Sequence, residues 1–297
     1  MKYTKPSISI LDQIQKLKDR GLSFGNESKA ADYLSNISFY RLRAYTYPFQ
    51  DNADINHPFV QKISFEDIIT LYVFDRKLRL LIFDAMEKIE ISLRTQIIYH
   101  YSLKHGSHWH IDPKHYRDSM RFANQVTDLQ KEINRGSETF ITHYQNKYTF
   151  PTEPPCWMSL EVSSIGLLSR IYQNLVKTNE KKEVANHFGI KDVNIFENWL
   201  FCFCSLRNIC AHHGRVWNRR LVKIVLPYNT ANQFLQNQDV YTNKLYATLS
   251  CVQYVLNIIS PGNDFKDRLK QIMQNCPLHQ EKEMGFPKEW ELEPIWN

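Results

Sequence analysis

Glycine is scarce in this sequence, with 9 residues among 297, and nowhere do glycines recur at the spacing of a phosphate-binding loop. Long stretches lack both glycine and proline, which disfavours the turn-dense all-β folds. Hydrophobic residues nonetheless make up 43% of the chain and aromatic residues 13%, too much for intrinsic disorder. We therefore expect an all-α globular protein.

Long hydrophobic runs are also missing. No run approaches the roughly eighteen consecutive apolar residues that span a bilayer, and residues 1–6 contain no apolar signal core. The 6 cysteines are scattered, without a CxxC pair or the density of a disulfide scaffold, which predicts reduced thiols. These absences predict a cytoplasmic protein that makes no contact with a membrane.

Helical signals run through most of the chain. Residues 64–67 resemble a capping box, and no glycine or proline follows until Gly106, which predicts one very long helix or two helices with a hidden bend. The segment 230–260 also lacks both residues and is predicted to be a helix. The tail at 284–296 has too many large apolar side chains to float freely, so we expect it to fold back over the helical body.

These elements predict an N-terminal helical extension over residues 1–60, a helical domain over 61–265 and a packed C-terminal tail over 266–297. Within the long helix, Glu90 and Arg94 lie four residues apart and can pair on one face. The simplest interpretation of that pair is a solvated salt bridge.

The segment 196–214 carries two stripes when placed on a helical wheel. One stripe is apolar and should face the core. The other lies on nearly the opposite side and becomes polar at Asn208 and His212, so we expect a polar cleft or another subunit to cover it. The first stripe is Trp199, Phe203, Leu206 and Cys210; the second is Phe201, Ser205, Asn208 and His212.

Arginine and histidine together suit the cleavage of phosphodiesters. The Arg207 guanidinium can bind phosphate oxygens through paired donors, while the His212 imidazole can accept or donate a proton near neutral pH, and neither group requires a metal. One histidine cannot easily act as acid and base at once. Two copies of the helix meeting across a two-fold axis would bring two histidines and two arginines into one cleft.

An arginine followed five to seven positions later by a histidine is a weak signal by itself, because 11 histidines allow chance matches such as Arg94 with His100. The surroundings of Arg207 are more informative. From Asn198 to Gln238 there is no acidic residue, within a chain whose formal net charge is +6. The basic residues there create a local positive field; they are Arg207, Arg215, Arg219, Arg220 and Lys223.

The segment 206–219, Leu-Arg-Asn-Ile-Cys-Ala-His-His-Gly-Arg-Val-Trp-Asn-Arg, resembles the signature of the Abi family of phage abortive-infection proteins, the AbiD and AbiF group of the HEPN superfamily. Looser similarity covers residues 33–45, 87–94, 155–161 and 284–287. The resemblance implies an all-α, HEPN-like helical bundle that acts as a dimer and cleaves RNA without a metal through an Arg-x4-6-His motif.

Carried over to this chain, Arg207 and His212 match the catalytic pair and Asn208 matches the polar residue that follows the arginine. Glu90 and Arg94 form the expected supporting network. The remaining candidates are RNA-binding residues, taken from the extension of the motif, the basic run and an aromatic-basic helix near the N-terminus: His213, Arg215, Asn218, Arg219, Arg220, Lys223, Arg41 and Arg43.

The sequence thus predicts a metal-independent endoribonuclease of the abortive-infection or toxin type. It would need no cofactor, form a homodimer, leave 2′,3′-cyclic phosphate ends and be restrained by an RNA or protein antitoxin. The alternative function is a noncatalytic RNA-binding or regulatory module that uses the same basic cleft.

Other interpretations stay open for individual residues. Arg207, Asn208 and His212 could form a buried polar network, with His212 paired to an acid such as Glu90. Residues 183–193 have the rhythm of a helix-turn-helix, although the next helix lacks basic residues before Arg207. Zinc is disfavoured, because Cys202 and Cys204 would point apart on a helix. The residues His108 and His110 flank Trp109 and are expected to be surface imidazoles.

Overall fold

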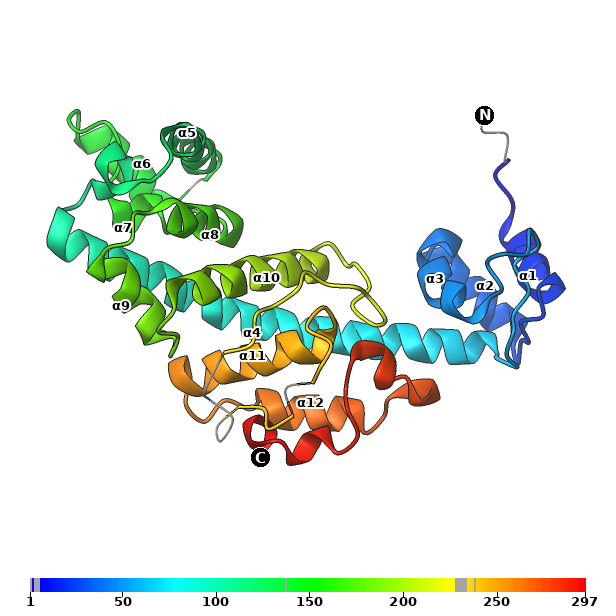
Figure 1. Cartoon of the computed structure of the whole chain (residues 1–297). Coiled ribbons are helices and arrows are strands. Elements are labelled where there is room, and N and C mark those ends of the chain that lie inside the picture. Colours follow the sequence, from blue (N-terminus) through cyan, green and yellow to red (C-terminus); the bar gives the residue numbers. More distant parts are fainter. Residues whose placement is uncertain (1, 3–5, 137, 228–233, 238) are drawn as a thin grey trace. The chain divides into compact units, whose positions relative to one another are not determined.

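The computed structural model describes residues 2, 6–136, 138–227, 234–237 and 239–297 (Figure 1). The regular structure of these residues is helical, which confirms the all-α class. The helices are α1 (Ile10–Asp19), α2 (Glu27–Asn36), α3 (Phe39–Thr46), α4 (Phe65–His105), α5 (Ser119–Arg135), α6 (Thr139–Lys147), α7 (Cys156–Ser159), α8 (Ile165–Asn174), α9 (Asn179–His187), α10 (Val193–Ala211), α11 (Leu245–Ile259) and α12 (Phe265–Met273). Short 3-10 turns lie at Tyr47–Phe49, Trp109–Ile111, Pro113–His115, Pro277–His279, Lys282–Met284, Trp290–Leu292 and Pro294–Trp296.

Helix α4 is the single long helix that the sequence allowed, without an interruption over its 41 residues. It begins at the predicted capping box: the N–H of Asp67 donates to Ser64 Oγ at 3.1 Å, and the N–H of Ser64 donates to the Asp67 carboxylate at 2.9 Å. It ends before Gly106, whose φ of +83° is in the left-handed region that favours glycine. None of the helices in the described residues is both long and apolar enough to cross a membrane.

The chain divides into two compact units. The first unit contains Met1–Arg79 and Gln271–Lys282, and the second contains Leu80–Lys270 and Glu283–Asn297, so that α4 and α12 each contribute to both. A buried polar cluster stabilises the first unit. Tyr45 donates its hydroxyl proton to Asp75 at 2.7 Å, and Arg79 Nε donates to the same carboxylate at 3.1 Å, which satisfies the fully buried Asp75.

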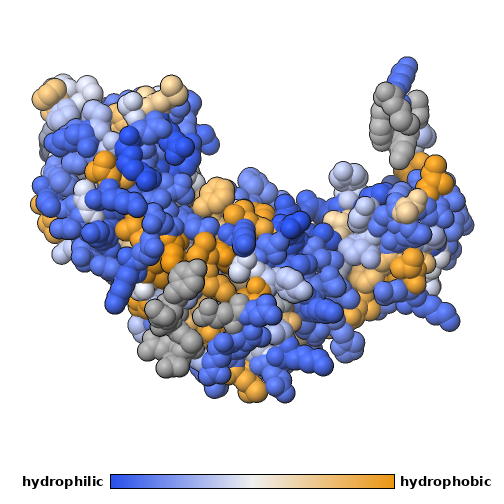
Figure 2. Space-filling model, viewed as in Figure 1, coloured by the Kyte–Doolittle hydropathy of each residue, from blue (hydrophilic) through white to orange (hydrophobic). Residues whose placement is uncertain are grey.

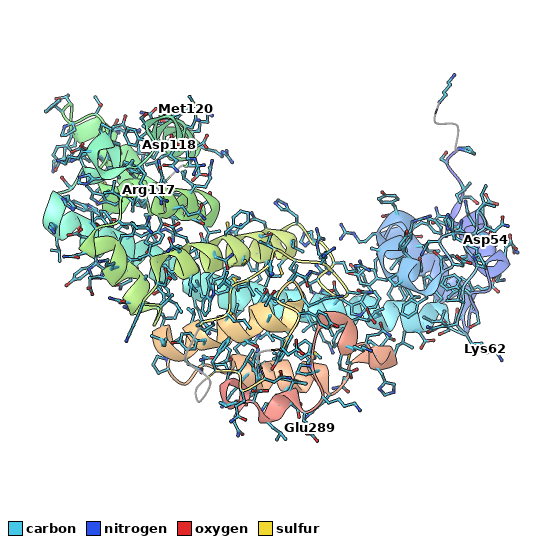
Figure 3. The ribbon with its side chains drawn as sticks, in the orientation of Figure 1. Asp54, Lys62, Arg117, Asp118, Met120 and Glu289 are labelled. Atoms are coloured by element: carbon cyan, nitrogen blue, oxygen red, sulfur yellow. The ribbon has the colours of Figure 1, made fainter. Side chains whose placement is uncertain are left out.

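Helix α10 is central to the second unit, where it packs against α8, α9 and α11. Helix α5 also packs against α8, and Asp118 caps its start by accepting a hydrogen bond from the N–H of Arg121 at 2.9 Å. Figure 3 labels Asp118 together with Arg117 and Met120 at this end of α5. The site described below is therefore built on a helix whose neighbours surround most of it.

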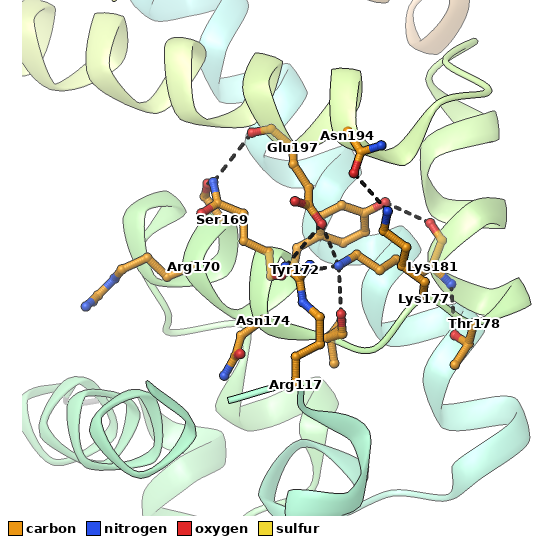
Figure 4. A network of polar contacts seen from close by, with 12 residues as sticks. Arg117, Ser169, Arg170, Tyr172, Asn174, Lys177, Thr178, Lys181, Asn194 and Glu197 are labelled. Carbon is orange, nitrogen blue, oxygen red and sulfur yellow. Dashed lines mark hydrogen bonds and ion pairs between the residues drawn. The ribbon is translucent and has the colours of Figure 1, made fainter. Parts of the chain in front are cut away.

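A buried lysine connects three of these helices (Figure 4). Lys181 of α9 is inaccessible to solvent, and its Nζ lies 2.7 Å from the Glu197 carboxylate of α10. It also donates to the carbonyl of Leu175 at 2.8 Å and sits 5.0 Å from the centre of the Tyr172 ring. Burial lowers the pKa of Lys181 to about 8, although the hydrogen bond that Lys181 donates to Glu197 opposes that shift. The network fixes α10 against α8 and α9.

The C-terminal tail packs as predicted. Phe286, Trp290 and Trp296 surround Tyr246 of α11, with ring centroids 5.0, 6.3 and 6.3 Å away. This cluster buries the large apolar side chains that the sequence left without a partner.

The predicted helix over 230–260 is wrong over residues 234–237 and 239–244, because α11 begins only at Leu245. Residues 230–233 and 238 lie outside the described part of the chain. Asn237 accepts a hydrogen bond from the N–H of Asp239 at 2.9 Å, a local bond that competes with helix formation. The Glu293 carboxylate accepts two further backbone N–H groups, those of Gln236 and Asn237. These bonds hold residues 236 and 237 in a non-helical conformation.

Candidate active site

The two stripes of α10 differ in exposure as their composition predicts. Trp199, Phe203 and Leu206 are at most 1% exposed. On the opposite stripe Asn208 and His212 are exposed and Phe201 is 53% exposed, and an apolar patch lies over α10 on the face drawn in Figure 2. The second stripe is thus open within a single chain. Its exposure excludes the alternative in which Asn208 and His212 form a buried network.

Helix α10 ends at Ala211, and His212 caps it in a Schellman turn. The N–H of His213 donates to the carbonyl of Cys210 at 3.0 Å, and the N–H of Gly214 donates to the carbonyl of Ile209 at 2.7 Å. His213 takes the left-handed conformation, with φ of +56°. A Cβ on Gly214 would lie 3.2 Å from the Ile209 carbonyl oxygen, so a larger residue would crowd the turn. The turn places the imidazole of His212 one helical turn beyond Asn208.

Arg207 lies against α4. Its Nη2 is 3.6 Å from Glu90 Oε2, its guanidinium carbon is 5.6 Å from the centre of the Phe83 ring, and its Nη1 donates to Asn208 Oδ1 at 3.4 Å. The Arg207 side chain keeps 28% of its surface exposed. The guanidinium is therefore oriented by three neighbours and still faces solvent in part.

Glu90 also binds Arg94, at 3.1 Å, as the i,i+4 spacing predicts. The pair is not solvated, however, since Arg94 is only 8% exposed and donates Nε to the Leu160 carbonyl and Nη2 to the Ser163 carbonyl, both at 2.9 Å. These bonds fix Arg94, and Arg94 fixes Glu90. The result is a chain of charges, Arg94–Glu90–Arg207, that ends at the exposed stripe of α10; Glu90 binds these arginines rather than His212.

The predicted basic segment folds back along α10. The N–H of Val225 donates to Asn198 Oδ1 at 2.8 Å, and Asn198 Nδ2 donates to the carbonyl of Lys223 at 3.2 Å. Within the segment, Arg219, Arg220 and Lys223 are exposed. An anion that approached this segment would therefore meet these three basic side chains.

Two further candidates, Arg215 and Asn218, form contacts that stabilise the turn after α10. Arg215 stacks on Trp217, with 5.2 Å from its guanidinium carbon to the ring centre, and donates Nη2 to the carbonyl of Asn218 at 3.2 Å. Asn218 has φ of +44° and accepts a hydrogen bond from Lys244 Nζ at 3.4 Å. Arg219 donates back to the carbonyl of Arg215 at 3.3 Å. These contacts hold the segment beside His213.

Arg41 and Arg43 belong to α3 in the first unit, whereas α10 belongs to the second. Arg43 lies 5.8 Å from the centre of the Tyr47 ring, and Tyr40 on the same helix is 85% exposed. The aromatic and basic side chains of α3 are thus partly directed outward, while Tyr45 is buried.

Two histidines and one cysteine outside the motif are buried or half-buried in the fold. His110 is 2% exposed, which corrects the prediction of a surface imidazole, and burial lowers its pKa to about 3. His108 is half-buried and its Nε2 lies 2.9 Å from the carbonyl of Glu153. Burial raises the pKa of the Cys202 thiol to about 12, so this thiol is protonated at neutral pH.

Phe83, like Glu90, makes a contact with Arg207 that the sequence did not reveal. It is 38% exposed and lies seven residues before Glu90, so both residues share one face of α4. A large apolar residue on an otherwise polar helical face was the available signal. Its ring covers one side of the Arg207 guanidinium.

A family model for Abi-like proteins matches residues 32–218, which run from α2 to the turn after α10. The chain belongs to the Abi-like protein family. The matched range includes Glu90, Arg94, Arg207, Asn208 and His212. Membership supports a role in abortive-infection defence in general. No curated protein and no solved structure gave a match to this Abi-like chain.

Proposed function

We propose that this Abi-like protein is a metal-independent endoribonuclease that acts in the cytoplasm during phage defence. The observation that carries the proposal is the cluster on the open stripe of α10. Arg207, held by Glu90 and Phe83, donates to exposed Asn208, exposed His212 follows Asn208 by one helical turn, and an exposed basic segment comes next. Such a cluster supplies a phosphate-binding cation and a proton-transfer group in one place.

In the proposed reaction Arg207 binds the scissile phosphate and stabilises the negative charge that develops on it. His212 transfers protons between the 2′-hydroxyl, which attacks the phosphorus, and the 5′-oxygen, which leaves. Asn208 orients the imidazole or the substrate. The products are a 2′,3′-cyclic phosphate and a 5′-hydroxyl, so no water is consumed in this step.

Glu90 would act by positioning Arg207 rather than by touching RNA. Because its carboxylate takes one edge of the guanidinium, Arg207 keeps a fixed orientation while its remaining N–H groups stay available for phosphate oxygens. Arg219, Arg220 and Lys223 would contact the flanking phosphates and increase the affinity for RNA.

A homodimer would complete this site. The open stripe includes Phe201, a large apolar residue with 53% of its surface exposed, next to Ser205 and Asn208. If two copies met along this stripe around a two-fold axis, the shared cleft would contain two imidazoles, one to act as base and the other as acid. Unrestrained RNA cleavage would harm the cell, so an RNA or protein antitoxin would restrain the enzyme.

The test is incubation of RNA with the full chain in the presence of EDTA. We expect cleavage to persist, to leave 2′,3′-cyclic phosphate ends, and to fall by about a hundredfold or more in His212→Ala. His143→Ala, which removes an exposed histidine of α6, should cleave at the wild-type rate. Tight RNA binding by the wild type without cleavage would instead support the noncatalytic RNA-binding module. A wild-type protein that neither cleaved nor bound RNA would contradict both functions.

A further inference from the structure

The first unit contains a groove that takes no part in the proposed cleavage. It lies among α2, the first turns of α4 and residues 271–275 at the end of α12, and its volume is about 710 Å³. All of these segments belong to the same unit; Figure 1 shows α2 and the start of α4 in blue to cyan. A volume in this range is typical of sites for small molecules, which measure roughly 300–1,000 Å³.

The floor of the groove is apolar and aromatic. Phe65, Ile69 and Phe74 line it and are 2%, 7% and 4% exposed, while Val73 at the opening keeps 38% of its surface exposed. Tyr33 of α2 lines the facing wall, 6.4 Å from the Phe65 ring. This surface would gain favourable free energy by contact with an apolar body.

The charges that line the groove do not cancel. Lys29 of α2 and Lys77 of α4 are both exposed, and among the described residues neither takes part in an ion pair. The only lining carboxylate is Glu66, which accepts hydrogen bonds from the N–H groups of Gly25 and Asn26 at 3.1 Å each. Those amides at the start of α2 offset its charge. The groove therefore presents two cations from two of its walls.

We infer that this groove binds a small molecule with an apolar ring body and one anionic group. The ring body would contact Phe65, Phe74 and Val73, and the anion would lie between Lys29 and Lys77. The amides of Gln271 and Asn275 on the third wall would fix the orientation of the molecule. The inference is independent of RNA cleavage by the second unit.

The probe for this site is 8-anilinonaphthalene-1-sulfonate, and N-phenyl-1-naphthylamine supplies the same rings without the charge. Fluorescence titration of the full chain should give one saturable site for the sulfonate. Thr70→Trp fills the opening and should weaken its binding by about tenfold or more. The matched control is Thr95→Trp, since Thr70 and Thr95 are both exposed on α4 and both donate their hydroxyl to the carbonyl four residues earlier.

The charge requirement is tested separately. The double variant Lys29→Gln with Lys77→Gln should weaken sulfonate binding by about fivefold or more and leave the neutral dye within about twofold. Lys16→Gln with Lys62→Gln, two exposed lysines of the same unit outside the groove, should alter neither dye. Far-UV circular dichroism and thermal melting of each variant check that it folds. A further variant, Thr70→Glu, places a negative charge at the groove and should repel the sulfonate.

Three results would overturn the inference: no saturable binding of the sulfonate, binding that is equally affected by Thr70→Trp and Thr95→Trp, or equal losses for the charged and the neutral dye in the double lysine variant. Binding of an acidic peptide or of anionic vesicles in place of the dye would overturn it as well, because either result assigns the groove to a macromolecular partner.

Discussion

Neutralising Glu90 tests the charge chain on which the proposed active site depends. Glu90 lies 3.1 Å from Arg94 and 3.6 Å from Arg207, and its side chain is only 15% exposed. Glu90→Gln keeps the shape of the side chain and removes its charge. Arg94 would then be a buried cation without a carboxylate partner, held by the carbonyls of Leu160 and Ser163 and by the neutral amide oxygen at position 90.

The expected magnitude follows from these contacts. A hydrogen bond to a charged group contributes about 1.5–3 kcal/mol, and part of the loss is recovered because the carboxylate no longer has to be desolvated. We expect the free energy of unfolding to fall by about 1–3 kcal/mol. For a unit of this size, that change lowers the melting temperature by about 3–10 °C.

Glu90→Gln should slow RNA cleavage without weakening RNA binding. Without its carboxylate partner, Arg207 would lose its orientation, and we expect kcat to fall by about tenfold or more. The local positive charge rises at the same time, so the affinity for RNA should stay equal or increase. A purely structural role for Glu90 would lower both activities together.

The assay compares melting, RNA binding and RNA cleavage for the wild type, Glu90→Gln and Glu87→Gln. Glu87 is exposed, one turn earlier on α4, and its substitution should leave all three measurements unchanged. The reasoning would be refuted if Glu90→Gln melted and cleaved like the wild type, or if Glu87→Gln produced the same losses.

Three further outcomes can be measured on the second unit. Phe201→Glu should convert a dimer to a monomer in gel filtration at micromolar concentration and abolish RNA cleavage. Leu103→Glu, at a residue 72% exposed on α4, should leave dimerisation and cleavage unchanged. A Phe201→Glu variant that still dimerised would contradict the proposed interface. His213→Gly should raise the free energy of unfolding by about 0.5–1 kcal/mol because φ is positive there, and a gain of equal size in His213→Ala would exclude backbone strain as the cause. The pKa of buried His110 is about 3 in the folded state and near 6.5 when unfolded, so the unfolded chain binds more protons below pH 6.5. The free energy of unfolding measured in urea should therefore fall by about 1.4 kcal/mol for each pH unit below 6.5, toward pH 3. An unfolding free energy that stays constant between about pH 6.5 and 5 would count against the burial of His110.

Features set by neighbours in the sequence could be predicted. The capping box at Ser64 and the glycine at 106 determine the ends of α4, because both act through bonds within a few residues. The periodicity of α10 likewise identified Trp199, Phe203 and Leu206 as buried. Such features need no knowledge of how distant segments pack.

Features set by packing could not be predicted. The i,i+4 rule pairs Glu90 with Arg94, but it does not indicate that Arg94 is buried against carbonyls after α7 or that Glu90 reaches Arg207. The non-helical path around Asn237 likewise depends on Glu293 from the tail. In both cases the deciding partner lies far away in the sequence, where periodicity carries no information.

The five-residue spacing of Arg207 and His212 has to be considered together with the end of α10. On an uninterrupted helix, residues five apart point about 140° away from each other, so Arg207 and His212 would serve different faces. His212 caps α10 and its N–H still donates to the Asn208 carbonyl at 3.0 Å, so it keeps the helical register, while Glu90 and Phe83 direct the Arg207 side chain along α4. Asn208, bonded to Arg207 and one turn before His212, lies between the two. Arg207 and His212 would therefore meet one ligand through the reach of their side chains rather than through a shared helical face, whereas the six-residue spacing of Arg94 and His100 near the end of α4 leaves Arg94 bonded to buried carbonyls.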